Sequence, residues 1–336
     1  MKRTFIIAEA GVNHNGELNL AYQLINEAIE AGADAIKFQT YKTDKLVTRS
    51  AKKAEYQKKS EWVNQTQFQM LKQLELSYGE FEELFEYCKD KKIQFISSPF
   101  DIESVDLLDR LGVSLFKIGS GEITNKKLLQ HIASKNKPVI LSTGMSTLDE
   151  VIIAIQWILE RAHVSITLLH CNSDYPSKYE DINLQAMQTI KDATKLKVGY
   201  SDHSKGIEIP IAAVAMGAEV IEKHFTLDKK MDGPDHSSSL NPKELSAMVS
   251  AIRNVEMAIG NGSKSPSASE LKNRESVRKS LIVNKDIIAG TKLSEELIEI
   301  KRPGKGIAPQ NIDYVIGMHV TKDVSKDTCL QWSDFK

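Results

Sequence analysis

The sequence is poor in cysteine, in net charge and in long hydrophobic runs. Its 336 residues include three cysteines, Cys88, Cys171 and Cys329, which lie far apart and form no CxxC pair. This spacing argues against a disulfide framework or a thiolate zinc site and suits a reducing cytosol. Lys and Arg number 44 against 45 Asp and Glu, so the net charge of -1 favours neither nucleic acid nor an anionic membrane. No apolar run approaches the roughly 20 residues of a membrane span, and we therefore expect a cytoplasmic protein.

No predicted strand is followed by a glycine-rich dinucleotide-binding fingerprint. Gly119 and Gly121 come nearest to it but do not have its spacing. The sequence contains instead eight short apolar segments, each followed by a helix-like pattern. Such alternation predicts a parallel sheet, and eight is the number of strands that closes a (β/α)8 TIM barrel. An open doubly wound sheet is the alternative. The predicted strands cover residues 5–9, 35–39, 94–98, 115–119, 139–143, 165–171, 197–201 and 220–225.

The composition changes after Gly260. Residues 261–279 are polar and contain Gly, Ser and Pro, which predicts a linker. Residues 280–336 have short apolar runs separated by turn residues, and a domain of this size is too small for much independent stability. We therefore expect a barrel over residues 1–260, a linker over 261–279 and a small domain over 280–336 that packs on its own or a partner's barrel.

The second connection, residues 40–77, is too long for an ordinary loop. Loops of this length in compact domains are usually lids or partner surfaces. It contains a basic segment with Lys52, Lys53, Lys58 and Lys59. Because the whole chain is neutral, a solvated helical face is favoured over a nucleic-acid site.

Polar side chains follow the predicted strands at their carboxyl ends, where α/β enzymes place their chemistry. Lysines in otherwise apolar strands are costly to bury unless they are paired or used. Together with hydroxyls and backbone amides, two lysines predict a cradle for a phosphorylated anion, whereas a single lysine could form a structural ion pair with Glu9 or Glu222. The residues at these strand ends are Glu9, Asn13, His14, Lys37, Gln39, Ser97, Ser98, Lys117, Ser120, Glu122, Ser142, Thr143, His170, Asn172, Ser173, Tyr175, Ser201, His203, Glu222 and His224.

Two histidines, His203 and His224, end neighbouring strands of the predicted barrel. Two imidazoles at adjacent strand ends suit a divalent transition ion with open positions for water and substrate. The alternative is that each ring caps its strand with a hydrogen bond. His236 and the neighbouring Asp235 are candidates for a third ligand and its carboxylate partner. His170 lies within a strand, which predicts a core histidine.

Ten segments, in order along nearly the whole chain, resemble the nonulosonic-acid synthases, which include the sialic, legionaminic and pseudaminic acid synthases. The small domain resembles the antifreeze-like (SAF) domain that follows the barrel in this family. The segments are IIAEAGVNHNG (6–16), IKFQT (36–40), SSPFD (97–101), FKIGSGE (116–122), ILSTGM (140–145), HCNSDYP (170–176), GYSDHS (199–204), EKHFTLD (222–228), GPDH (233–236) and KRPGKGI (301–307).

The resemblance implies an enzyme that condenses phosphoenolpyruvate with an N-acylated mannosamine-type sugar and releases phosphate. It implies that Glu9 is the catalytic acid/base and that His203 and His224 hold a divalent metal, most often Mn²⁺ with Mg²⁺ or Co²⁺ as alternatives. The implied phosphoenolpyruvate ligands are Lys37, Lys117, Ser120, Ser142, Ser201 and either Asn172 or Ser173. The implied sugar ligands are Gln39, Glu122, Tyr175, Asp235 and Arg302.

A domain-swapped homodimer is also implied, in which Arg302 of one subunit contacts the N-acyl group bound in the other. The main expectation is an N-acetylneuraminate synthase that uses N-acetylmannosamine. The alternatives are the same reaction on 2,4-diacetamido-2,4,6-trideoxymannose, which gives di-N-acetyllegionaminate, and pseudaminate synthesis. A deoxy-sugar-phosphate synthase and a sugar- or ice-binding module with an inert barrel are further alternatives, and the intact Glu9, Lys37 and Lys117 argue against the last.

Overall fold

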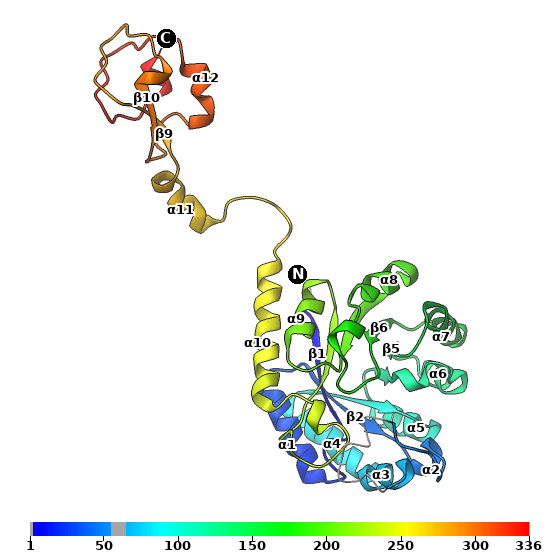
Figure 1. Ribbon diagram of the computed structural model, residues 1–336. Helices are drawn as coiled ribbons and strands as arrows, with labels where there is room; N and C mark the ends of the chain where they lie inside the picture. Colours follow the sequence, from blue (N-terminus) through cyan, green and yellow to red (C-terminus); the bar gives the residue numbers. More distant parts are fainter. Residues whose placement is uncertain (1–2, 55–64, 336) are drawn as a thin grey trace. The chain divides into compact units, whose positions relative to one another are not determined.

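The computed structural model describes residues 3–54 and 65–335 and divides into two units, Met1–Asn261 and Gly262–Lys336 (Figure 1). The strands of the first unit are β1 (Phe5–Gly11), β2 (Ala35–Thr40), β3 (Gln94–Pro99), β4 (Phe116–Ile118), β5 (Val139–Ser142), β6 (Ile166–Cys171), β7 (Lys197–Asp202) and β8 (Val220–His224). Its helices are α1 (Leu18–Glu30), α2 (Thr43–Leu46), α3 (Gln67–Leu74), α4 (Tyr78–Lys91), α5 (Ile102–Leu111), α6 (Lys126–Ala133), α7 (Leu148–Arg161), α8 (Gln185–Thr194), α9 (Glu208–Ala215) and α10 (Pro242–Ile259).

The strands of the first unit form one parallel sheet in the order β3-β2-β1-β8-β7-β6-β5-β4. The two end strands, β3 and β4, lie against each other and close the ring. In the described residues this seam has no backbone ladder, and a side-chain hydrogen bond from Gln94 Nε2 to Ser114 Oγ (2.7 Å) crosses it. The predicted TIM barrel is confirmed, and each predicted strand matches an observed one to within two residues at either end.

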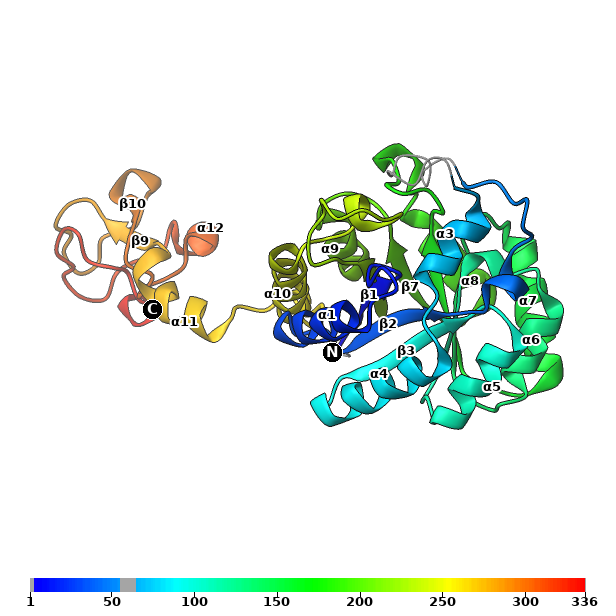
Figure 2. The same ribbon diagram turned by 90° about the horizontal axis from the view of Figure 1, so that it is seen from below.

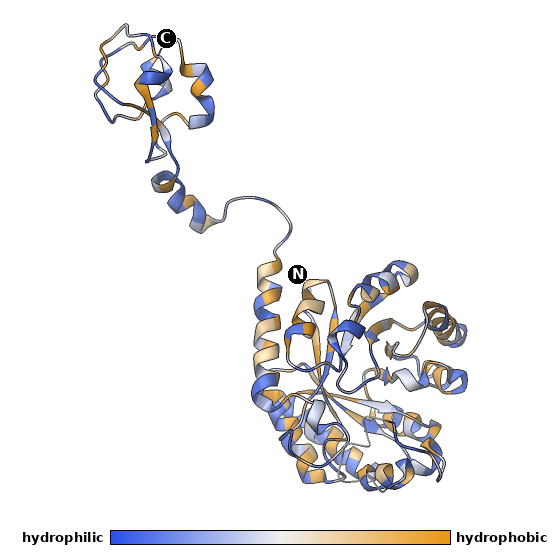
Figure 3. Ribbon diagram, viewed as in Figure 1, coloured by the Kyte–Doolittle hydropathy of each residue, from blue (hydrophilic) through white to orange (hydrophobic). Residues whose placement is uncertain are grey.

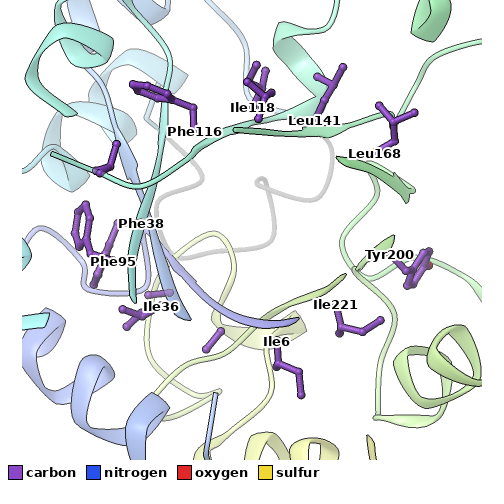
Figure 4. Packing of buried hydrophobic residues seen from close by; sticks show 14 of the residues in the cluster. Ile6, Ile36, Phe38, Phe95, Phe116, Ile118, Leu141, Leu168, Tyr200 and Ile221 are labelled. Carbon is purple, nitrogen blue, oxygen red and sulfur yellow. The ribbon is translucent and has the colours of Figure 1, made fainter. Parts of the chain in front are cut away.

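The helices pack on the outer face of the ring, because alternate residues of each strand point outward. Figure 4 shows Ile6, Ile36, Phe38 and Leu141 projecting from the strands away from the barrel interior. In α1 the buried residues recur at helical spacing, and α1 packs beside α4 (Figure 2). Hydrophobic and hydrophilic residues accordingly alternate along the outer helices in Figure 3, as expected for helices with one buried stripe.

The other alternate residues point into the barrel and form two successive sets. The first set, which we name the apolar layer, consists of Ile7, Ala35, Ile96, Ile140, Leu169 and Val220, all buried. Two residues further along the strands comes a second set, named here the charged layer, made of Glu9, Lys37, Lys117 and Glu222. Between β1 and β2 the ladder pairs Ile7 with Ala35 and Glu9 with Lys37, so both layers continue across these two strands. Between β1 and β8 the register is offset, and Ile7 lies beside Glu222.

The long second connection contains α2 and α3. Lys52 is exposed and Lys53 is buried, in a stretch without helix, so the predicted solvated helical face is wrong for Lys53. Lys58 and Lys59 lie outside the described residues. Among the described helices, none has the length and apolar character required to cross a membrane.

The second unit has its own small core around Leu281, Val283, Leu293 and Val315. Its strands β9 (Ser280–Val283) and β10 (Ile298–Lys301) pair antiparallel. The stretch predicted as a linker contains helix α11 (Ala268–Val277), and the short helix α12 (Ile312–Val315) lies near the chain end.

Candidate active site

The charged layer is a network of alternating charges. Lys37 Nζ lies 2.8 Å from Glu9 Oε1 and 3.8 Å from Glu222 Oε2, and Lys117 Nζ lies 3.4 Å from Glu222 Oε1. All four side chains are buried. Two lysines and two carboxylates balance each other, which offsets part of the high cost of taking four charges out of water. Glu9 Oε2 and Glu222 Oε2 are nevertheless buried without a hydrogen-bond partner.

Hydroxyl groups complete the hydrogen bonds of this network. Lys117 donates to Ser142 Oγ at 2.8 Å, and Ser201 Oγ donates to Glu222 Oε1 at 2.8 Å. Lys37 donates to Ser98 Oγ at 3.3 Å. Ser98 was not among the ligands implied by the resemblance, although its place at the end of β3 gives it the same inward direction as Gln39 on β2. The lysine head groups are therefore held in place before any anion binds.

The protein environment gives the two carboxyl groups, Glu9 and Glu222, different pKa values. Burial raises the pKa of Glu9 to about 7, although Lys37 opposes this rise. Burial alone would also raise the pKa of Glu222, but Lys117 and Lys37 outweigh it and lower this pKa to about 2. Glu222 is thus the permanent anion of the network, whereas Glu9 can gain or lose a proton near neutral pH.

The two histidines lie together above the charged layer, with ring centroids 5.5 Å apart. The ring of Tyr175 is 4.1 Å from that of His203 and 5.6 Å from that of His224. Burial lowers the pKa of both histidines, which favours neutral imidazoles. His203 Nδ1 lies 2.5 Å from the carbonyl oxygen of Asn172, an arrangement that leaves the lone pair on Nε2. The buried His224 Nδ1 has no hydrogen-bond partner.

These two imidazoles fit a divalent transition ion, since each keeps one nitrogen available. His236 does not join them, because its Nδ1 contacts Thr226 Oγ1 at 2.6 Å and its Nε2 contacts Asn15 Oδ1 at 3.0 Å. Within residues 3–54 and 65–335, no cluster of three or more His, Cys, Asp or Glu side chains has the arrangement of a metal site. A metal at His203 and His224 would thus keep several positions open.

A cavity of about 430 Å³ opens over the charged layer. Its remaining wall is largely apolar and includes Leu46, Val47 and Leu71 of the long second connection, which agrees with the prediction that this connection is functional. Of the residues expected at the site, the cavity is lined by Glu9, Lys37, Gln39, Lys117, Ser120, Ser142, Ser173, Tyr175, Ser201, His203 and His224.

Four expected site residues lie elsewhere. Asn172 points away from this cavity and donates its amide to Asp181 O at 2.6 Å, so of the two open alternatives only Ser173 lines it. Glu122 accepts a hydrogen bond from Asn125 at 2.7 Å. Asp235 is buried outside the cavity lining, and this burial raises its pKa, although the nearby Lys37 opposes the rise. Arg302 belongs to the second unit, where its Nε donates to Val277 O at 3.0 Å.

Gly144 is a further residue of the site that the sequence analysis did not single out. Its N–H donates to Ser120 Oγ at 2.9 Å. A Cβ at this position would lie 2.5 Å from Ser173 Oγ and 2.8 Å from Ser120 Oγ. Only glycine therefore lets the backbone approach both serines, and the signal was its place directly after a strand end.

Comparisons with known proteins identify the family of this chain. A model described as the NeuB family matches residues 24–264, and one described as the SAF domain matches residues 278–336. The chain belongs to the NeuB family. The chain is 50% identical over 333 residues to the N,N'-diacetyllegionaminic acid synthase of Campylobacter jejuni. This match covers 98% of this chain and 100% of that protein.

Two further relatives point to the same family. The N,N'-diacetyllegionaminic acid synthase of Legionella pneumophila is 49% identical over 332 residues, covering 98% of this chain and 93% of that protein. The crystal structure of N-acetylneuraminic acid (sialic acid) synthetase from Leptospira borgpetersenii, in complex with citrate, is 39% identical with a TM-score of 0.71 and covers 82% of this chain and 93% of that chain. The predicted family, the SAF domain and the prediction that the chain is an enzyme are confirmed.

Proposed function

We propose that this NeuB-family chain is an N,N'-diacetyllegionaminic acid synthase. It would condense phosphoenolpyruvate with 2,4-diacetamido-2,4,6-trideoxymannose and release phosphate. The observation that carries this choice of sugar is the 50% and 49% identity to two synthases of that name over nearly the whole chain. N-acetylneuraminate synthesis, the main expectation from the sequence, becomes the second candidate, which the 39% identity to the Leptospira synthetase favours.

Phosphoenolpyruvate would bind over Lys37 and Lys117. Both head groups line the cavity, and their carboxylate partners fix them by ion pairs. Lysine ammonium groups and serine hydroxyls are suitable partners for phosphate and carboxylate oxygens. The serines that would complete this anion site are Ser120, Ser142, Ser173 and Ser201, all of which line the cavity.

Glu9 would be the group that moves protons. Its Oε1 is paired with Lys37, whereas its buried Oε2 has no hydrogen-bond partner. A carboxyl group with a pKa near 7 can donate and accept protons at neutral pH. In the proposed reaction, carbon three of phosphoenolpyruvate forms a bond to the aldehyde carbon of the open-chain sugar. Water then adds at carbon two before phosphate leaves, and Glu9 exchanges a proton with the aldehyde oxygen or this water.

His203 and His224 would hold a divalent ion, with Mn²⁺ as the first choice and Mg²⁺ or Co²⁺ as alternatives. When bound, such an ion polarises a carbonyl oxygen as a Lewis acid. The hydrogen bond between His203 Nδ1 and Asn172 O orients the first ring for this role. The unpartnered His224 Nδ1 offers the second nitrogen.

Gln39 and Tyr175 line the cavity and would contact the sugar directly. Asp235 and Glu122 would do so only after a side-chain movement, because neither lines the cavity in this structure. Arg302 would reach the site of a second chain, in a domain-swapped homodimer. Its side chain is exposed in the second unit, which leaves it available to a partner.

The Arg302→Ala variant tests this last role. Losing the arginine should raise the KM for the sugar at least about 10-fold, as expected for a lost hydrogen bond to a charged group, and should leave the KM for phosphoenolpyruvate nearly unchanged. Lys305→Ala, in the same exposed turn, is the matched control. An unchanged sugar dependence of Arg302→Ala would exclude the swapped contact.

The decisive experiment measures phosphate release from phosphoenolpyruvate in the presence of Mn²⁺, with the two sugars in parallel. A higher kcat/KM with 2,4-diacetamido-2,4,6-trideoxymannose is expected. A preference for N-acetylmannosamine would support the second candidate with the same site. Absence of release with both sugars, in a chain that binds phosphoenolpyruvate and Mn²⁺, would overturn both choices of acceptor.

A further inference from the structure

A second buried ion pair lies on the opposite face of the two strands that carry the histidines. Asp202 and Lys223 are the last ladder pair of β7 and β8 and point away from the barrel interior. Their side chains are 0% and 1% exposed, and Lys223 Nζ contacts Asp202 Oδ2. The same ammonium group donates to Ser204 O at 2.6 Å, and Ser204 N donates to Asp202 Oδ1 at 2.9 Å. Three residues are thus joined in one closed network.

This network joins the two chain neighbours of His203. The histidine lies between Asp202 and Ser204 in the chain, and both neighbours are bonded to Lys223. Lys223 in turn directly precedes His224. The β7–β8 ladder ends at Asp202 and Lys223, so the side-chain network links the two strands just where their backbone pairing stops. The backbone that carries His203 is thereby tied to the backbone that carries His224.

Stability alone is a weak explanation for this pair. Its surroundings are the apolar outer layer, where Tyr200, Ile221 and Phe225 are fully buried. A buried ion pair among such residues often contributes no more to stability than an apolar pair of similar volume, because both charges lose their hydration. What a charge-assisted link does provide is a fixed direction and length.

We propose that Asp202 and Lys223 are positioning residues that set the separation of His203 and His224 and thereby the affinity of this site for a divalent ion. The proposal rests on the metal site of the proposed function. Partners of this kind around metal ligands typically change metal affinity by about 10- to 100-fold when they are removed.

The test uses the full-length chain and the variant Asp202→Leu/Lys223→Met, in which an apolar pair replaces the charges. Binding of Mn²⁺ alone is measured by the electron paramagnetic resonance signal of the free ion, and thermal unfolding is recorded in parallel without metal. We expect Mn²⁺ binding to weaken about 10- to 100-fold while the metal-free melting temperature stays close to that of the wild type.

Arg253→Met is the matched control. It removes a partly buried ion pair with Asp34 (2.6 Å) where the chain enters β2, at the opposite end of the barrel. This variant should bind Mn²⁺ like the wild type, even if its melting temperature falls. A general loss of packing would weaken Mn²⁺ binding in both variants, and that result would overturn the specific role of Asp202 and Lys223.

Wild-type Mn²⁺ affinity in the folded double variant also overturns the proposal. If the double variant does not fold, Asp202→Glu and Lys223→Arg take its place, because they keep both charges and change only the length or shape of the link. Each should weaken Mn²⁺ binding, and wild-type affinity in both overturns the proposal. A wild-type chain that does not bind Mn²⁺ would instead refute the metal site itself, and the positioning role with it.

Discussion

The apolar layer and the charged layer occupy the same barrel interior, and on β1, β2 and β8 their members lie two residues apart. On β1 the step from Ile7 to Glu9 leads from one to the other, and on β8 the step from Val220 to Glu222 does the same. Both layers are almost completely buried. Burial therefore does not distinguish the two layers. What differs is whether the side chains leave polar atoms without a hydrogen-bond partner.

In the apolar layer, packing alone suffices. Leu169 and Ile140 contact other apolar side chains, and their burial stabilises the fold by removing apolar surface from water. In the charged layer, four charges balance, yet Glu9 Oε2 and Glu222 Oε2 remain without hydrogen-bond partners. A native interior seldom leaves buried polar atoms unsatisfied, and where it does a functional reason is expected. The contrast predicts that the apolar layer serves the fold and the charged layer serves the reaction.

The largest effect should follow from Glu9→Gln. Removing the group that exchanges protons should lower kcat by about 10²- to 10⁴-fold. The free energy of unfolding should not fall, because burial disfavours the charged form of Glu9 more than the ion pair with Lys37 favours it, and a neutral amide avoids this cost. Phosphate release and urea unfolding measure the two quantities. Ile7→Val, one inward position earlier on β1, is the control and should keep kcat. Wild-type turnover in Glu9→Gln would refute its role.

The opposite pattern is expected for Leu169→Ala in the apolar layer. Deleting this fully buried side chain should lower the free energy of unfolding by about 2–5 kcal/mol through lost burial and a residual cavity. The kcat per folded molecule should stay close to that of the wild type. Urea unfolding with active-site titration measures both, and Leu169→Met, which nearly keeps the volume, serves as the control. A large loss of kcat in fully folded Leu169→Ala would contradict the prediction that the apolar layer serves only the fold.

The Asp235→Asn variant tests how the burial of a single carboxyl group changes stability with pH. Burial raises the pKa of Asp235 from 3.8 to about 6. Below pH 3.8 this aspartate is protonated in the folded and the unfolded chain, so it has no effect on stability. Between pH 3.8 and 6 only the unfolded chain releases the proton, which lowers stability, and above pH 6 the full loss is about 3 kcal/mol.

The asparagine variant should therefore be more stable than the wild type by up to about 3 kcal/mol at pH 7 and equally stable near pH 4. Thermal unfolding at both pH values measures this difference. Asp232→Asn, an exposed position in the same loop, is the control and should show little change at either pH. An equal gain at both pH values would mean that burial of the charge is not the cause.

The sequence predicted the strands well because parallel barrel strands are nearly continuous apolar runs that end in polar residues. The inward direction of Glu9, Lys37 and Lys117 also followed from strand position. The choice between Asn172 and Ser173 did not, although Leu169 and Cys171 of β6 face inward and Ser173 continues their alternation.

Other features depend on tertiary contacts that no local pattern records. Glu222 pairs with lysines from two other strands, and Lys37 bonds to Ser98 of the neighbouring strand. The role of Arg302 came only from the resemblance, because an arginine in an exposed turn carries no signal of its own for a partner's site.

The seam between β3 and β4 has one more consequence. In the part of the chain that the structure describes, these two strand edges meet without a backbone ladder, and the segment that contains α5 connects them in the chain. Exposed strand edges are templates for pairing with other chains. Because β3 and β4 lie against each other, closure of the ring covers the edge of each strand with the other strand. A barrel that opened at this seam would keep every ladder of the sheet and would expose two strand edges to other chains.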